Sequence, residues 1–281
     1  RQGLAIEAWI NPYRVSFNTS YSQLSKENPA RKWHESSNAS ERRNVLSYNG
    51  QLYYNPSKPE VRQLIIDGVE EIVRNYDVDG IHMDDYFYPS FSSSNYNKTF
   101  DAQEYNASTE KQNGMSIKNY RRKQVNKLVK GIKKAIDAID PDVVFGISPA
   151  GNIDSLNSKY SYYVNIKKWT NSTKFVDYIA PQIYWGFSHK TAKFDRMTDR
   201  WADMVDQSKV KLYIGIPAYK MGQPSNGTTK AERKELKGKT LLKKQAKYAI
   251  KKNADGIIVF DYADLDKTAC KKLAKYLKKT Y

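Results

Sequence analysis

Six short apolar segments, each followed by a polar loop, constrain the fold of this chain more than any other feature. They are rich in β-branched and aromatic residues and cover residues 4–10, 80–86, 143–149, 178–185, 211–219 and 256–262. Between them, apolar residues recur at helical spacing in residues 58–76, 117–139, 195–207 and 240–253. Strands that alternate with helices predict a parallel sheet with helices outside it.

An open doubly wound sheet and a closed barrel both satisfy this alternation, and the ends of the strands favour the barrel. Nearly every predicted strand ends in polar or aromatic residues, such as WINPYR (9–14), DDYFYP (84–89) and FDYAD (260–264). In a (β/α)8 barrel the residues that do chemistry lie at the carboxyl ends of the strands. We therefore predict one α/β domain over residues 1–281, a (β/α)8 TIM-type barrel with about six βα units visible.

Two long segments, residues 18–50 and 89–114, are rich in Ser and Asn and weakly periodic. Loops longer than about 12–15 residues are usually functional or disordered. Both segments follow strand ends, so we expect them to be loops that wall a cleft.

Two adjacent carboxylates, Asp84 and Asp85, are the strongest candidates for chemistry. Burying such a pair at a strand end is costly and needs a reason. Glycoside hydrolysis uses two carboxyl groups, one to protonate the leaving oxygen and one as nucleophile or as base for water. We predict Asp84 as the first choice for a catalytic carboxylate and Asp85 as the second choice. The alternative is that one of them caps a helix or pairs with a basic side chain.

Neighbours on the same strands extend this candidate site. His82 and Tyr86 share the Asp84 face because strand side chains alternate, although a lone His is more often a core residue. On the first strand, Glu7, Trp9 and Asn11 share a face that we expect to point into the barrel. The other face is expected to lie under helices, and consists of Leu4, Ile6, Ala8 and Ile10.

Glu7 and Asp261 are the candidate partners of this catalytic carboxylate, and each has an alternative role. Glu7 is either a site residue or the partner of Arg14, and Asp261 is either a third acid or a buried partner of Arg14. Gln182, Tyr184, Trp185 and Tyr219 are predicted to line a carbohydrate cleft, because aromatic rings stack on sugars and amides bind hydroxyls. The alternative is that these aromatic residues belong to the core.

Six longer segments carry a family resemblance: AWINPYRV (8–15), LYYNPSKPEVRQLI (52–65), VDGIHMDDYFYP (78–89), FGISPAGN (145–152), VDYIAPQIYWGF (176–187) and LYIGIPAYK (212–220). They resemble the family-10-like glycosyl hydrolases, bacterial envelope proteins with a (β/α)8 barrel. The resemblance implies hydrolysis of glycosidic bonds, with peptidoglycan glycan strands as the substrate class. It implies site roles for Asn11, Arg14, Asp84, Asp85, Tyr86, Gln182, Tyr184 and Trp185.

The resemblance also shows two departures. The chain starts at what would be the third strand of the family, so the family's first two βα units are expected to be missing from it, and whether those units carry a catalytic residue stays open. The segment DGIHMDDY (79–86) is distantly similar to a motif of family 18 chitinases, and Tyr86 stands where those enzymes carry a Glu acid. The chitinase mechanism is therefore not transferred.

Composition excludes several other classes. The single cysteine (Cys270) rules out a disulfide framework, and three histidines at unrelated spacings argue against a metal site. No Gly-rich phosphate loop is present, so no cofactor is expected. No apolar run approaches the roughly 18–20 residues of a membrane helix.

The net charge of +17 is concentrated near the C-terminus, where residues 208–281 hold 19 Lys and Arg against 6 Asp and Glu. This indicates either a solvated helix face or attraction to anionic cell-wall polymers. No nucleic-acid motif accompanies it, so nucleic acid is not an expected partner.

Together these features predict an extracellular or cell-surface glycosidase that acts on a cell-wall polysaccharide. Two alternatives remain open: a non-catalytic glycan-binding barrel, and a polyanion-binding protein in which the barrel is only a scaffold.

Overall fold

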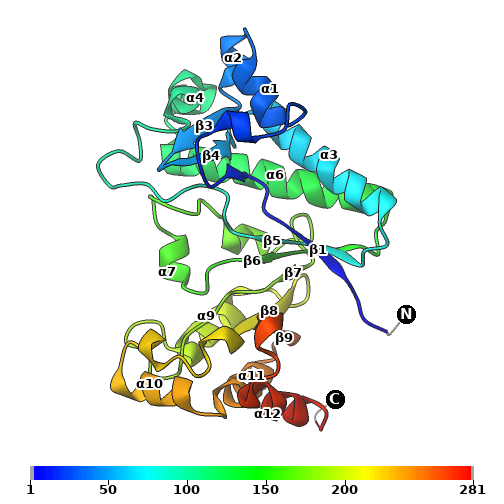
Figure 1. Ribbon diagram of the computed structural model, residues 1–281, viewed down its shortest axis with the longest axis vertical. Coiled ribbons are helices and arrows are strands. Elements are labelled where there is room, and N and C mark those ends of the chain that lie inside the picture. Colours follow the sequence, from blue (N-terminus) through cyan, green and yellow to red (C-terminus); the bar gives the residue numbers. More distant parts are fainter. Residues whose placement is uncertain (1–2, 280–281) are drawn as a thin grey trace. The chain divides into compact units, whose positions relative to one another are not determined.

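The structure is a computed structural model that describes residues 3–279 (Figure 1). Within them the chain divides into two compact units. The first unit comprises the chain up to Phe145 together with Leu156–Ile166, and the second comprises Gly146–Ser155 and the chain from Lys167 onward. The single barrel domain stays a prediction, and residues 280–281 of the Lys-rich C-terminal stretch lie outside the described residues.

Each unit contains parallel strands, as the alternation predicts. In the first unit β1 (Glu7–Ile10) pairs in parallel with β5 (Gly80–Asp84). Parallel strands of the second unit pair in the order β6 (Val144–Ser148, from Gly146 onward), β7 (Tyr178–Ile179), β8 (Lys211–Pro217) and β9 (Gly256–Phe260). Six of the predicted strands are therefore confirmed, and closure into an eight-stranded barrel stays a prediction.

The strand predicted over residues 178–185 is shorter than expected. Only Tyr178 and Ile179 form a ladder, and Gln182 makes isolated parallel bridges to Ala150 and Gly215. Pro181 explains the break, because proline has no N–H to donate to a ladder.

The expectation that the apolar face of β1 lies under helices is wrong. Leu4 and Ile6 are 78% and 63% exposed, and Ala8 and Ile10 are only partly buried. Among the described residues, β5 is the only strand that pairs with β1. The side chains along this strand therefore remain near the edge of the sheet.

Two long helices, α3 (Pro59–Asn75) and α6 (Ile117–Ile139), lie side by side in the first unit, close to the predicted ranges (Figure 1). Pro59 suits the first turn of α3, where its missing N–H has no partner to lose. The hydroxyl of Ser116 caps α6 by accepting the Asn119 N–H at 3.4 Å. Val61, Ile65 and Val69 of α3 are buried, and each such side chain contributes about 1.5–3 kcal/mol.

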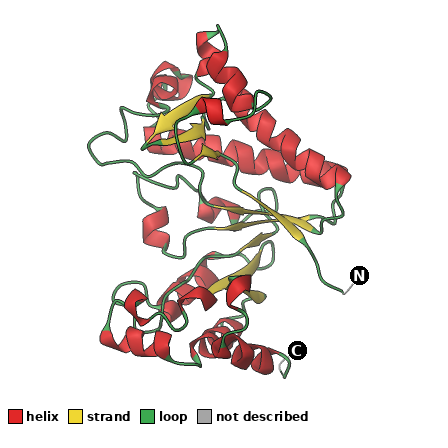
Figure 2. Cartoon of the chain, in the orientation of Figure 1, coloured by secondary structure: helices red, strands yellow, loops and turns green. Residues whose placement is uncertain are grey.

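The two segments expected to be long loops contain regular structure, so that expectation is wrong. The first holds a 3-10 turn η1 (Tyr21–Gln23), helices α1 (Pro29–Glu35) and α2 (Ala39–Arg42), and strand β3 (Val45–Tyr48). An antiparallel sheet joins β2 (Arg14–Ser16), β4 (Gln51–Tyr54) and β3 (Figure 2). The second segment holds α4 (Ala102–Ala107) and α5 (Thr109–Gln112).

The Asn and Ser residues that indicated loops act as helix caps. Asn28 accepts the Ala30 N–H and Asn38 accepts the Ser40 N–H, both at 2.9 Å. Such residues are favoured at helix N-caps for this reason. The composition is therefore typical of short capped helices as well as of loops.

A buried ion pair fixes the segment that follows β5. Arg121 of α6 is fully buried and donates from Nε to Asp101 Oδ1 at 2.7 Å and from NH1 to the Tyr163 hydroxyl at 2.8 Å. The other oxygen of Asp101 accepts the hydroxyls of Ser57 and Tyr88, each at 2.8 Å. Both carboxylate oxygens of Asp101 are thus engaged.

Replacing Arg121 by Met is expected to lower the free energy of unfolding by about 3–5 kcal/mol, because Asp101 would be left buried without its counter-charge. Urea unfolding followed by circular dichroism measures this. Arg74→Met is the control, since Arg74 makes only an exposed pair with Glu70 and should cost less than about 1 kcal/mol. A similar small loss for both variants would contradict the account.

The second unit contains helices in addition to its strands. Its longer helices are α9 (Phe194–Met204), α10 (Lys230–Lys237), α11 (Leu241–Lys251) and α12 (Thr268–Leu277). Short turns complete the chain: α7 (Ile153–Leu156), α8 (Ile166–Trp169), η2 (Ala218–Lys220), η3 (Pro224–Asn226) and η4 (Tyr262–Asp264). Across residues 3–279, no helix has both the length and the apolar character needed to cross a bilayer.

Candidate active site

The two predicted catalytic carboxylates lie at the carboxyl end of β5 and are almost completely buried. Asp84 is 7% exposed and Asp85 is 2% exposed. The indole Nε1 of Trp9 donates a hydrogen bond to Asp84 Oδ2 at 3.0 Å. The parallel register explains this contact, since Trp9 lies opposite His82 and next to the following residues of β5. A donor at 3.0 Å stabilises negative charge on that carboxylate oxygen.

Glu7 and His82 form a second pair on the same two strands, with Glu7 opposite Gly80 at the start of β5. His82 Nδ1 lies 3.9 Å from Glu7 Oε2. Burial lowers the pKa of His82 to about 4, so the imidazole is neutral near pH 7. Glu7 therefore faces a neutral ring near pH 7.

Arg14 and Tyr86 lie together at the exposed rim of this unit. The Arg14 guanidinium lies 5.6 Å from the centre of the Tyr86 ring and 4.4 Å from that of Phe17. Tyr86 is 48% exposed, which leaves its ring open to a ligand. Burial, and then the charges of Asp84 and Asp85, raise the pKa of the Tyr86 phenol. The phenol is thus a proton-bearing hydrogen-bond donor near both carboxylates.

Asn11 adds a polar group that the first unit leaves unsatisfied. Its side-chain oxygen is buried and has no hydrogen-bond partner among the described residues. A buried acceptor without a partner is uncommon in a native structure. It is available to a ligand hydroxyl.

Aromatic residues predicted to bind sugar cluster at the strand ends of the second unit. Tyr184 is stacked on Phe260 with ring centres 5.8 Å apart, and Tyr219 lies edge-on to both rings. Tyr184, Tyr219 and Phe260 are only partly buried, so the cluster has an accessible side. Gln182 donates from Nε2 to the Ser148 carbonyl at 2.8 Å, which fixes the amide.

Asp261 follows Phe260 at the end of β9. Its Oδ1 is buried and makes no hydrogen bond with residues that the structure describes. This isolated oxygen makes Asp261 the candidate acid of the second unit.

The loop that carries Trp185 is held by α10. Glu232 is buried and accepts the Gly186 N–H at 2.8 Å and the Thr228 N–H at 2.7 Å. Glu235 accepts the Ser188 hydroxyl at 2.7 Å. A side chain at Gly186 would meet the Glu235 carboxylate and would force it to shift, so glycine favours this close approach.

The same loop places the Trp185 ring 5.6 Å from His189, and the Trp185 carbonyl accepts Gln245 Nε2 at 2.8 Å. Within residues 3–279, no three His, Cys, Asp or Glu side chains gather as a metal site would require.

Comparison with known proteins decides the family. The family model for glycosyl hydrolase-like 10 matches residues 1–231. The chain belongs to the glycosyl hydrolase-like 10 family. The family resemblance expected from the sequence motifs is therefore confirmed.

Two relatives of this glycosyl hydrolase-like 10 chain illustrate the match. Glycosyl hydrolase YngK of Bacillus subtilis (strain 168) is 37% identical over 239 residues, which cover 79% of this chain and 44% of YngK. Glycosyl hydrolase DigH of Escherichia coli (strain K12) is 34% identical over 238 residues, which cover 80% of this chain and 53% of DigH. The chain thus spans about half the length of the curated relatives it matches.

Solved structures show the same type of fold at low identity. The PgaB (BpsB) glycoside hydrolase domain of Bordetella bronchiseptica has a TM-score of 0.54 at 10% identity, covering 98% of this chain and 75% of that one. A GH42 β-galactosidase of G. stearothermophilus has a TM-score of 0.51 at 10% identity, covering 83% and 42%. The fold of this glycosyl hydrolase-like 10 chain is thus similar to that of TIM-barrel glycosidases.

Tyr162 is a neighbour of the carboxylates that sequence reasoning missed. Burial, and then the charges of Asp85 and Tyr86, raise the pKa of its phenol. Its φ of 61° lies in the left-handed region, where non-glycine residues are uncommon and often functional. Tyr162 does not follow a strand, so the expectation that site residues lie at strand ends could not identify it.

Proposed function

We propose that this protein is a glycoside hydrolase that acts outside the cell on a cell-wall polysaccharide, with peptidoglycan glycan strands as its substrate. The observation that carries the proposal is the buried Asp84–Asp85 pair at the end of β5, in a chain of a glycosyl hydrolase family. Two carboxyl groups are the usual requirement of glycoside hydrolysis. The substrate class is the one that the family resemblance implies.

The contacts of the carboxylates suggest how they share the reaction. Asp84 accepts the Trp9 indole and is suited to the charged role, as nucleophile or as base for water. Asp85 lies next to it and is the first candidate for the acid that protonates the leaving oxygen. Glu7 is the alternative acid of the first unit, and Asp261 that of the second.

Substrate contacts are proposed for the polar and aromatic residues around these acids. In the first unit, Asn11 offers an unsatisfied oxygen, and Arg14 and Tyr86 offer donors and an exposed ring. In the second unit, Tyr184, Tyr219 and Trp185 offer rings, which present apolar faces to sugars.

Incubating the protein with peptidoglycan freed of its peptides tests this function. Mass spectrometry should detect soluble oligosaccharides, and their reducing-end sugar names the bond cleaved. Chitin oligosaccharides and cellulose oligosaccharides serve as comparison substrates. Binding without release from any of these glycans would favour the non-catalytic glycan-binding alternative.

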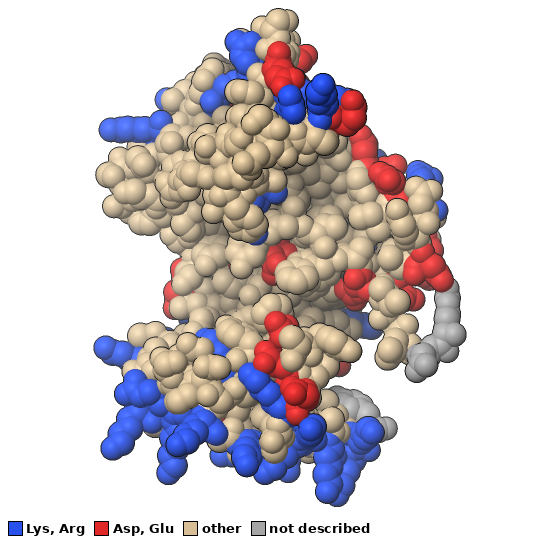
Figure 3. Space-filling model, in the orientation of Figure 1, with Lys and Arg blue, Asp and Glu red and all other residues tan. Residues whose placement is uncertain are grey.

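The basic face of the second unit supports a role at the wall. Figure 3 shows Lys and Arg crowded over the part of the surface that contains α10, α11 and α12. Exposed members include Lys237, Lys243, Lys247, Lys271, Lys272 and Lys275. We propose that this face attracts anionic cell-wall polymers.

Raising the salt concentration from 0.05 M to 0.5 M is expected to weaken binding to purified cell walls by about tenfold or more, because salt screens exposed charges. A cosedimentation assay measures the bound fraction. Binding to walls stripped of their anionic polymers should change much less with salt. A fraction bound to intact walls that does not change with salt concentration would contradict this role.

A further inference from the structure

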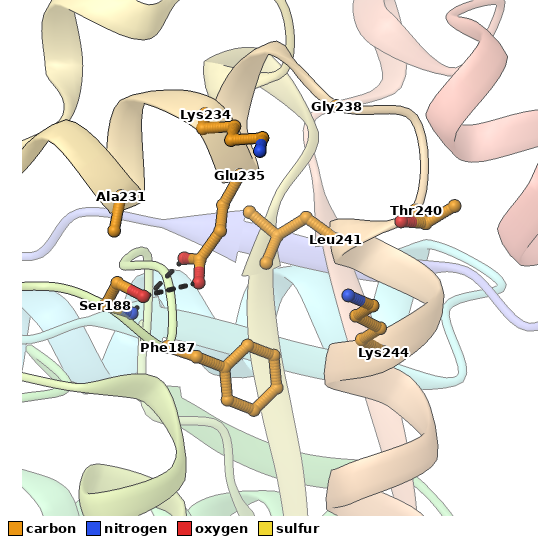
Figure 4. Close-up of a pocket in the computed structure, with 9 residues that line it drawn as sticks. All are labelled: Phe187, Ser188, Ala231, Lys234, Glu235, Gly238, Thr240, Leu241 and Lys244. Carbon is orange, nitrogen blue, oxygen red and sulfur yellow. Dashed lines mark hydrogen bonds between the residues drawn. The ribbon is translucent and has the colours of Figure 1, made fainter.

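A cavity of about 530 Å³ lies in the second unit, between α10, the first turn of α11 and the loop that follows β7 (Figure 4). Its walls include Phe187, Ser188, Lys234, Glu235, Leu241 and Lys244. Small-molecule sites typically measure about 300–1,000 Å³. None of these residues belongs to the carboxylate site of the first unit.

The charges of the cavity favour an anion. Glu235 is engaged by Ser188, whose hydroxyl and N–H it accepts at 2.7 and 3.2 Å. The ammonium groups of Lys234 and Lys244 make no hydrogen bond or ion pair with any residue that the structure describes. The cavity is therefore lined by two free positive charges and by one carboxylate that already has its donors.

The acid of α10 that does not line the cavity is also turned away from these lysines. Glu232 is buried and directs both oxygens to the loop residues Gly186 and Thr228. The helix thus uses both of its acids to hold the loop and leaves its basic side chains unneutralised. Thr240 at the N-cap of α11 makes no capping bond with its side chain, which adds a weak preference for negative charge.

The remaining wall is apolar and suits a sugar ring. Phe187 and Leu241 both line the cavity (Figure 4). Phe194 and Tyr248 support the Phe187 ring, with ring centres 5.2 and 6.0 Å away. A rigid aromatic face beside free ammonium groups is a combination that fits a sugar carrying an acidic group.

We propose that this cavity binds an anionic saccharide unit, a sugar or sugar-alcohol unit that carries a carboxylate or a phosphate. The assignment of this saccharide unit to the polysaccharide being cleaved rests on the proposed function. Phe187 lies two residues after Trp185, and Gln245 of α11 donates to the Trp185 carbonyl. A glycan held here would therefore be anchored on the same loop that presents Trp185.

Calorimetric titration with short, soluble oligomers tests the proposal without requiring turnover. The probes are a glucuronic acid oligomer, a glycerol phosphate oligomer and a neutral chitin oligomer. At least one acidic probe should bind about tenfold or more tightly than the neutral one, since hydrogen bonds to charged groups are the strong ones. The acidic probe that binds identifies carboxylate or phosphate as the source of the charge.

Paired variants separate the cavity from the basic face. Lys234→Gln/Lys244→Gln should weaken acidic binding by about tenfold or more, whereas Lys271→Gln/Lys272→Gln removes the same charge from the basic face on α12 and should weaken it by about threefold at most. Ala231→Leu, which fills the cavity without changing charge, should also weaken binding. Circular dichroism verifies that each variant is folded.

Equal losses in the two double variants would overturn the proposal, because the attraction would then belong to the whole basic face. So would the absence of binding by both acidic probes. Failure of the hydrolase proposal looks different: the protein would bind the acidic probe and release nothing from peptidoglycan.

Discussion

The Asp84→Asn variant is expected to lose about 10²–10⁴-fold of the rate at which soluble oligosaccharides are released, the range that positioned acid–base groups contribute. The substitution removes the charge but keeps an oxygen for the Trp9 indole, which donates to Asp84 at 3.0 Å in the wild type. The fold and the affinity for glycan should therefore persist. Initial rates from reducing-end assays at saturating glycan measure the effect.

Asp142→Asn is the matched control, because Asp142 is an exposed acid in the turn before β6. Its rate should equal that of the wild type. If the Asp84→Asn variant keeps the wild-type rate, Asp84 takes no part in the reaction. Asp85 and Glu7 then become the candidate catalytic carboxylates.

The Trp9→Phe variant is expected to lower kcat by about 10–100-fold, since a hydrogen bond to a charged group is worth about 1.5–3 kcal/mol. Trp9 is 60% exposed, so the smaller ring should be tolerated by the fold. The lost interaction is the indole N–H on Asp84 Oδ2. Steady-state kinetics over a range of glycan concentrations separate kcat from KM.

Trp33→Phe on α1 provides the comparison, because the Trp33 indole N–H makes no hydrogen bond with the described residues. That variant should keep its kcat. A Trp9→Phe variant that raises KM and leaves kcat unchanged would show that Trp9 binds the sugar and does not act through Asp84.

The strands and long helices could be predicted from the sequence because they depend on local periodicity. Helices α3 and α6 place Val61, Leu128 and their neighbours on one buried side, and the spacing of these apolar residues is visible in the sequence. The carboxylate pair was recognisable for a related reason. Asp84 and Asp85 end a strand whose other residues are mostly buried, so their position on the sheet follows from the chain alone.

Features that depend on distant contacts could not be predicted. The partner of Asp101 is Arg121, twenty residues away on another element, and no spacing rule links them. Tyr162, whose pKa is raised by burial and by the charge of Asp85, stands in a left-handed turn rather than at a strand end. The cavity beside Phe187 exists because Glu232 and Glu235 bend a loop toward α10, and neither residue stands in a recognisable motif.

The most direct test measures binding and cleavage of peptide-free glycan strands in the same samples of wild-type and Asp84→Asn protein. The account predicts that both bind, with dissociation constants within about threefold of each other, and that only the wild type releases oligosaccharides. Wild-type protein that binds the strands and releases nothing, or an Asp84→Asn variant that releases them as fast as the wild type, would contradict it.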